Sequence, residues 1–122
     1  MKRKIIFYGN YFLDFYARQD HKTREKIDFV LDLIRHVERV PIKFLKYMEG
    51  TNGLYEVRVM TQRKKIRIFS FFDEGNLIIL INCFDKKTDK TPKNELDLGK
   101  KLKEEYFVGK SKGKEDEKNN HI

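Results

Sequence analysis

The sequence predicts an α+β fold, in which an N-terminal helical hairpin packs on a twisted, mainly antiparallel four-stranded sheet. Three observations lead to this prediction. Residues 54–84 hold three apolar or alternating runs separated by short turns, a pattern that indicates strands joined in hairpins. Two stretches with apolar residues at helical spacing precede these runs, and a third follows them. The expected order is therefore β-α-α-β-β-β, followed by a C-terminal helix.

The first strand and the helical hairpin are expected in the N-terminal third of the chain. The apolar run within Lys4 to Tyr8 is too short for the core of a signal peptide and predicts a strand. Asn10 is a candidate N-cap for a short helix, and Asp20 for the longer helix after it. The longer helix carries an apolar stripe that ends before Pro41 and consists of Ile27, Val30, Leu31, Ile34 and Val37.

A linker is expected at Ile42 to Met48, before the three strands. These strands are predicted at residues 54–60, 65–72 and 77–84, the last two joined by a turn at Asp73-Glu74-Gly75-Asn76. Pro92 suits the first turn of a final helix that ends near Phe107. Residues 1–108 are therefore expected to form a single domain, and the polar residues 109–122 a disordered tail.

The charge of the chain favours an anionic partner. The formal net charge is +8, and the tail, with four Lys against three acidic residues, contributes only +1 of it, which leaves +7 on residues 1–108. Such a surplus favours RNA, DNA or an acidic protein, although a lysine-rich surface kept for solubility gives the same balance. No apolar stretch is long enough to span a bilayer, and the lone Cys83 excludes a disulfide framework. We therefore expect a cytoplasmic protein without membrane contact.

Alternation along the first strand hairpin places charged side chains on one face of the sheet. Glu56 and Arg58 share this face on one strand, and Arg67 lies opposite Arg58 on the next. That register requires the apolar residues to pair as Val57 with Ile68 and Val59 with Ile66. Two like charges paired across a sheet are destabilising unless an anion lies between them. Glu56 can supply this anion internally, or the two guanidinium groups can bind a phosphate.

The last strand ends in a lysine-rich loop. Residues 77–84 are apolar on both faces of the pleat, which predicts a buried interior strand with a cationic rim at its end. Lys86 and Lys87 in that rim would complete the phosphate site. The three histidines and Cys83 have no spacing typical of metal ligands, so we expect neither a metal nor a cofactor.

Three sequence blocks carry a family resemblance. They are GTNGLYEVR at residues 50–58, KIRIF at residues 65–69 and FDKKTDKTPKNE at residues 84–95. In this order and spacing the chain resembles toxins of the RelE/ParE superfamily, in their HigB-like (phage-derived Gp49-like) branch, over roughly residues 4–107. The resemblance implies a RelE-like fold and the toxin of a type II toxin–antitoxin system. It also implies a cognate antitoxin, typically a helix-turn-helix protein encoded by an adjacent gene.

The same resemblance implies an activity. Members of the HigB branch cut mRNA in the ribosomal A site through attack of a ribose 2′-hydroxyl on the adjacent phosphate, without a metal. The implied activity is thus that of a metal-independent endoribonuclease (mRNA interferase), with the ribosome and mRNA as partners. By position, the resemblance implies catalytic roles for Arg58, Arg67 and Lys87. RNA contacts are expected from the neighbouring lysines Lys65, Lys86, Lys90 and Lys93.

The chain departs from the family pattern at two places. Leu54 and Glu56 stand where many ribosome-dependent members have lysines, and residues 92–94 offer no Tyr or His as acid or base. Glu56 is a candidate for the catalytic general base, and a neutral lysine is another. Two other functions therefore stay open: a ParE-like toxin that inhibits DNA gyrase, and an inactive member that only binds its antitoxin.

Overall fold

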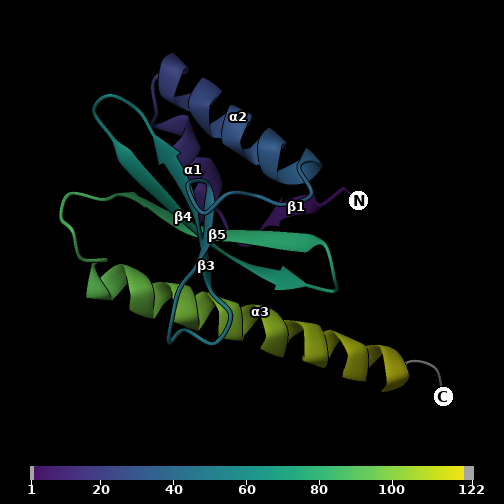
Figure 1. Ribbon diagram of the computed structural model, residues 1–122. Helices are drawn as coiled ribbons and strands as arrows, with labels where there is room; N and C mark the ends of the chain where they lie inside the picture. Colours follow the sequence, from purple (N-terminus) through teal and green to yellow (C-terminus); the bar gives the residue numbers. More distant parts are fainter. Residues whose placement is uncertain (1, 120–122) are drawn as a thin grey trace.

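A five-stranded sheet lies between two helical layers in the computed structural model, which describes residues 2–119 (Figure 1). Helices α1 (Tyr11–Ala17) and α2 (His21–His36) cover one face of the sheet, and α3 (Lys93–Asn119) crosses the other. The strand order is β1-β5-β4-β3-β2, with β1 parallel to β5 and the other neighbours antiparallel. The strands are β1 (Lys4–Phe7), β2 (Leu45–Tyr47), β3 (Tyr55–Met60), β4 (Lys65–Asp73) and β5 (Leu77–Asp85). The predicted α+β class is confirmed.

The sheet has one strand more than the four predicted. The short edge strand β2 lies within the segment expected to be a linker, and it pairs Leu45 with Val57 and Tyr47 with Tyr55. Leu45 is half-buried, whereas Lys46 and Tyr47 are exposed. An exposed edge strand of three residues carries too little apolar alternation to be distinguished from a loop.

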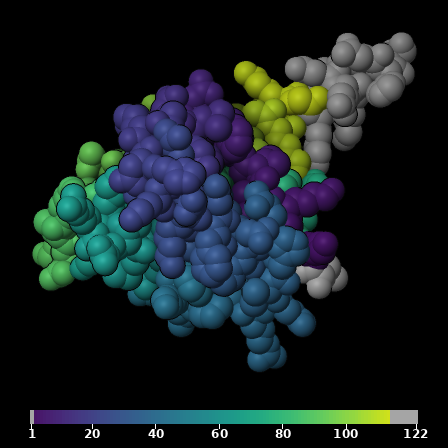
Figure 2. Space-filling view, turned by 90° about the horizontal axis from the view of Figure 1, so that it is seen from above, coloured from purple at the N-terminus to yellow at the C-terminus, as the bar shows by residue number. Residues whose placement is uncertain are grey.

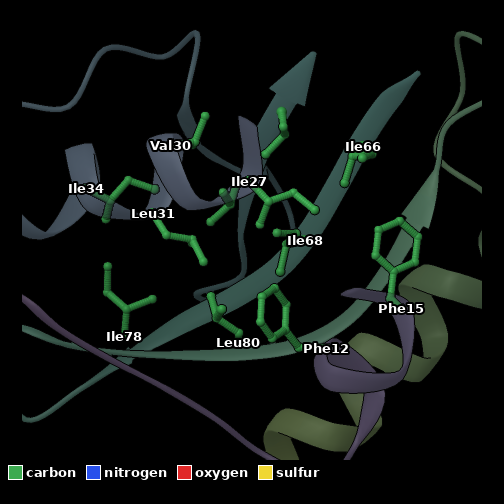
Figure 3. Packing of buried hydrophobic residues seen from close by; sticks show 12 residues of the cluster. Phe12, Phe15, Ile27, Val30, Leu31, Ile34, Ile66, Ile68, Ile78 and Leu80 are labelled. Carbon is green, nitrogen blue, oxygen red and sulfur yellow. The ribbon is translucent and has the colours of Figure 1, made fainter. Parts of the chain in front are cut away.

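The first core lies between the sheet and the helical hairpin. Asp20 begins α2 as predicted, because its carboxylate accepts a hydrogen bond from the Thr23 N–H at 2.8 Å. Val37 follows the last residue of α2 and is exposed, so the apolar stripe is one residue shorter than expected. The remaining stripe residues pack with the two phenylalanines of α1 against four apolar residues of β4 and β5 (Figure 3): Phe12, Phe15, Ile27, Val30, Leu31, Ile34, Ile66, Ile68, Ile78 and Leu80.

The second core lies between the sheet and α3. Its buried members are Leu54, Phe69, Phe71, Ile79, Ile81, Phe84 and Leu102. The helix approaches the sheet closely at Gly99, where an added Cβ would lie only 2.8 Å from Phe69 Cδ2. A larger residue at this crossing of helix and strand would therefore force the helix or the Phe69 ring to shift.

The helix α3 continues beyond the end near Phe107 that the sequence predicted. Residues 109–119 are helical, whereas a disordered tail was expected from residue 109. Lys110 explains the difference in part, because its Nζ donates to Asp73 Oδ2 at 2.9 Å and to Glu74 Oε1 at 2.7 Å. This contact with the β4–β5 turn anchors the first of the additional helical turns. Residues 120–122 of the predicted tail lie outside the described residues.

Candidate functional site

Two arginines oppose each other across β3 and β4, as the sequence predicted. Arg58 pairs with Arg67 in the sheet, in the register that joins Val57 to Ile68 and Val59 to Ile66. The apolar partners belong to the core beneath α1 and α2. By alternation the arginines lie on the opposite face of the sheet, the one that α3 partly covers.

Glu56 lies between the two arginines and pairs with both. Its side chain is 6% exposed, and its Oε1 accepts a hydrogen bond from Arg58 Nε at 3.0 Å. The same oxygen lies 3.7 Å from Arg67 Nε. One carboxylate thus serves as counter-ion for two guanidinium groups, and the cluster keeps one net positive charge.

Arg67 is the less satisfied of the two arginines. Its Nη1 donates to the Ile66 carbonyl at 3.1 Å, but its buried Nε has no hydrogen-bond partner among the described residues. Burial lowers the pKa of Arg67 from its ordinary value and Arg58 adds to this effect, while Glu56 opposes it. The guanidinium remains protonated at neutral pH all the same, so its charge is incompletely compensated.

Arg58 is the arginine that a ligand can reach first. Its side chain is 24% exposed, against 8% for Arg67. A phosphate arriving from solvent would therefore meet the Arg58 guanidinium first, with the more buried Arg67 beside it on the neighbouring strand.

An aromatic wall borders the arginines on the side of β5, and the sequence did not indicate it as part of the site. Phe84 is the partner of Arg67 on β5, and its ring packs on Phe69 at a centroid distance of 5.2 Å with planes at 81°. Both rings are buried, so they exclude water from this side of Arg67. Strand alternation alone would have indicated one of the two rings, because Phe69 lies on the same strand face as Arg67.

The cationic rim forms where β4 begins and β5 ends. The Lys86 N–H donates to the Lys65 carbonyl at 2.7 Å, and the Lys65 N–H donates to Asp85 Oδ1 at 3.1 Å. These bonds place Lys86 beside Lys65, which shares the strand face of Arg67. Figure 2 shows the start of β4 (teal) and the loop after β5 (green) side by side at one end of the molecule. The predicted proximity of rim and arginines is thus present for Lys65 and Lys86.

The other predicted lysines lie farther out. Lys87 pairs with Asp85 Oδ2 at 2.8 Å, and Lys93 pairs with Asp97 Oδ2 at 3.0 Å on the first turn of α3. Both ammonium groups are mostly exposed, and such surface pairs contribute little stability and exchange readily. Lys90 is exposed in the loop between them. Within residues 2–119, no hydrogen bond or ion pair joins Lys87, Lys90 or Lys93 to the arginines.

Neither a reactive cysteine nor a metal-ligand cluster is found within residues 2–119. Burial raises the pKa of the Cys83 thiol, which therefore stays protonated and unreactive. No group of three or more His, Cys, Asp or Glu residues within residues 2–119 is arranged to hold a metal ion.

None of the helices in the described residues combines the length and the apolarity that crossing a membrane requires.

Comparison with known proteins identifies the family. A search of curated proteins found no match. The family model described as phage-derived protein Gp49-like (DUF891) matches residues 14–104, a range that contains both arginines, Glu56 and the lysine rim. Because this range covers more than half of the chain, the protein belongs to the phage-derived Gp49-like family, a RelE-like family associated with the toxins of toxin–antitoxin systems.

Proposed function

We propose that this protein inhibits translation by cutting mRNA in the ribosomal A site, as the toxin of a type II toxin–antitoxin system. The observation that supports this proposal is the pair of arginines that share one buried carboxylate beside a lysine rim. The cluster retains a positive charge, and a phosphodiester can compensate it through planar guanidinium donors. Membership of this toxin family suggests that the partner is an antitoxin. We expect this antitoxin to be a helix-turn-helix protein encoded by an adjacent gene.

The chemistry that fits this cluster is transfer of a phosphoryl group within the RNA itself. The ribose 2′-oxygen forms a bond to the adjacent phosphorus while the bond to the 5′-oxygen of the next nucleotide breaks. The products are a 2′,3′-cyclic phosphate and a 5′-hydroxyl. The nucleophile belongs to the substrate, so the protein contributes orientation and stabilisation of the growing charge.

Each residue of the cluster receives a role in this proposal. Arg58 contacts the phosphoryl oxygens, and Arg67 on the neighbouring strand stabilises the charge that develops there, next to the apolar wall formed by Phe84. Glu56 is engaged by both arginines, so we assign it the role of counter-ion that positions them. The proton of the 2′-hydroxyl then passes to a rim lysine in its neutral form or to a group of the ribosome, and a protonated rim lysine or a group of the ribosome supplies the proton that the departing 5′-oxygen takes up.

The lysines hold the RNA strand. Lys65 and Lys86 lie side by side at the end of the sheet next to the arginines, where they contact the phosphates that follow the cleaved one on that side. Lys87, Lys90 and Lys93 form the outer part of the same basic surface and contribute to the encounter with RNA.

Programmed ribosomes test this proposal. Wild-type protein is expected to cut the message within the A-site codon, and Arg58→Ala to slow cleavage by about 100-fold or more, because an oriented charge donor is lost. Arg39→Ala removes an equally charged, exposed arginine outside the site and is the matched control. An intact message at stoichiometric protein, or full activity of both Arg58→Ala and Arg67→Ala, would refute the proposal.

A ParE-like inhibitor of DNA gyrase is the second candidate function. The engagement of Glu56 by both arginines favours it, because this engagement removes the most evident general base of the site. Supercoiling by purified gyrase is the discriminating assay, and activity that stays normal at excess protein argues against this function. An inactive member that only binds its antitoxin is excluded if expression without antitoxin arrests growth.

A further inference from the structure

We infer that a second site for the RNA phosphate backbone lies between the start of α2 and the turn that joins β3 to β4. The inference rests on the proposed function in one respect, that the ligand is RNA. A hollow of about 630 Å³ lies here, lined by cationic side chains from both elements: Lys22 and Lys26 from α2, and Arg63 and Lys64 from the turn. None of these residues belongs to the arginine cluster or to the predicted rim.

The positive charge of this hollow is not balanced within the described residues. Asp20 is the one carboxylate that lines it, and this carboxylate is engaged as the N-cap of α2 by the Thr23 N–H at 2.8 Å. The side chains of Lys22 and Arg63 are exposed and make no hydrogen bond or ion pair with residues 2–119. Lys22 and Lys26 are also spaced as like charges one helical turn apart, an arrangement that destabilises a helix. An anion bound in the hollow would offset this excess of positive charge and reduce the repulsion between Lys22 and Lys26.

The turn that carries Arg63 and Lys64 is held in a defined conformation. The Thr61 N–H donates to the Lys64 carbonyl at 3.0 Å, and Thr61 Oγ1 accepts from the Lys64 N–H at 3.0 Å and the Arg63 N–H at 3.3 Å. Lys64 Nζ donates to Gln19 Oε1 at 2.7 Å, which ties the turn to the segment before α2. The backbone of the turn and the Lys64 ammonium are therefore positioned before a ligand arrives, and binding costs little ordering of the backbone.

The position of the hollow connects it to the first site. Arg58 and Arg67 lie two residues from the ends of β3 and β4, and the turn with its cations follows directly. The arginines lie on the face that α3 partly covers, whereas the hollow lies on the side of α2. In Figure 2 the teal turn lies between the dark blue start of α2 and the green loop after β5. An RNA strand that leaves the arginines can thus pass around the hairpin end and reach the hollow.

The chemistry of the hollow favours RNA over an acidic protein segment. Apart from Met60, every residue that lines it has a charged or polar side chain, and Met60 is 51% exposed. A thioether packs well against a flat aromatic ring, so Met60 offers a surface to a nucleobase next to the bound phosphate.

Salt-dependent binding to an uncleavable RNA tests the second site. The probe is a single-stranded oligonucleotide with 2′-O-methyl riboses, and the variant is Lys22→Ala/Arg63→Ala. Each lost phosphate contact is expected to reduce the slope of log affinity against log salt by about 0.7, so the double variant should lose about 1.4. The control, Arg39→Ala/Lys101→Ala, removes one exposed arginine and one exposed lysine elsewhere and should keep the wild-type slope. Thermal unfolding of both variants checks that they fold.

A second arm uses ribosomes without message and separates the two sources of RNA. A reduced slope with the oligonucleotide assigns the site to a single strand such as mRNA, and a reduced affinity for empty ribosomes alone assigns it to ribosomal RNA. The inference is overturned if the double variant and its control behave alike in both arms. Since the oligonucleotide cannot be cut, a change in slope without cleavage of any message would refute the proposed function and leave this site standing.

Discussion

Replacement of Gly99 by alanine tests how closely α3 packs on the sheet. An alanine Cβ would lie 2.8 Å from Phe69 Cδ2 and 3.4 Å from Asn82 Oδ1, and carbon atoms do not approach one another to 2.8 Å without displacement. The Phe69 ring is fully buried and packs edge-on against Phe84. It has no free space to move into, so the helix must shift instead.

The expected magnitude combines two opposing effects. Alanine is favoured over glycine in a helix by about 1 kcal/mol, while overpacking a filled core costs about 1–3 kcal/mol. Gly99→Ala is therefore expected to range from neutral to about 2 kcal/mol less stable than wild type. Gly109 lies in the same helix, and its added Cβ would have no described heavy atom within 4 Å. Gly109→Ala should show the gain alone, about 1 kcal/mol.

Urea-induced unfolding followed by circular dichroism measures both variants against wild type. The difference between Gly99→Ala and Gly109→Ala isolates the packing cost, because the gain in helix propensity is common to both. Equal stabilisation by the two alanines would show that α3 does not approach Phe69, and it would refute this argument. Since Phe69 supports the wall beside Arg67, Gly99→Ala should also lower RNA cleavage more than Gly109→Ala does.

Substitutions at three further positions test the charged side chains that stabilise the fold. Glu56→Gln is expected to lower the free energy of unfolding by roughly 3–5 kcal/mol, because it leaves the buried Arg67 without a counter-ion; a loss below about 1 kcal/mol in urea unfolding would contradict the shared pairing. Asp73→Asn should make stability less sensitive to acid. The hydrogen bond from Lys110 holds the pKa of the Asp73 carboxyl below its usual value, with help from Tyr106. Its contribution is therefore complete above about pH 4 and is lost as the pH falls through the lower folded-state pKa, which thermal unfolding across an acidic pH series measures. Asp20→Ala should cost about 1 kcal/mol of stability by removing the cap of α2, whereas Asp20→Asn should cost less.

The pairing of the arginines was predictable because a strand has a period of two. Val57 and Val59 had to face the same core as Ile66 and Ile68, and a slip of one residue would have placed them on the opposite face of the sheet, that of the arginines. The tight β3–β4 turn then left one register that matched apolar to apolar, and this register brought Arg58 opposite Arg67.

Other features of the fold depend on contacts that leave no local trace in the sequence. The register of β4 against β5 shifts between Ile68 and Ser70, which a strand that is apolar on both faces accommodates without any change in its pattern. The extension of α3 similarly includes a contact between Lys110 and Asp73, which lie far apart in the chain. Local composition indicated disorder after residue 108, and it gave no sign of this tertiary ion pair.

The role of Glu56 is the part of the site that required geometry. Sequence alternation left two possibilities, a carboxylate that neutralises the arginines or arginines free to bind phosphate, and the observed distances show that the carboxylate pairs with both arginines. Glu56 holds both guanidinium groups, yet one carboxylate cannot neutralise two positive charges. The two arginines oppose each other, and the buried Nε of Arg67 has no hydrogen-bond partner among the described residues. An apolar cross-strand pair at these positions would make the fold more stable. A departure of this kind from the pairing that favours stability is expected at functional positions, and an anionic ligand is what would compensate it.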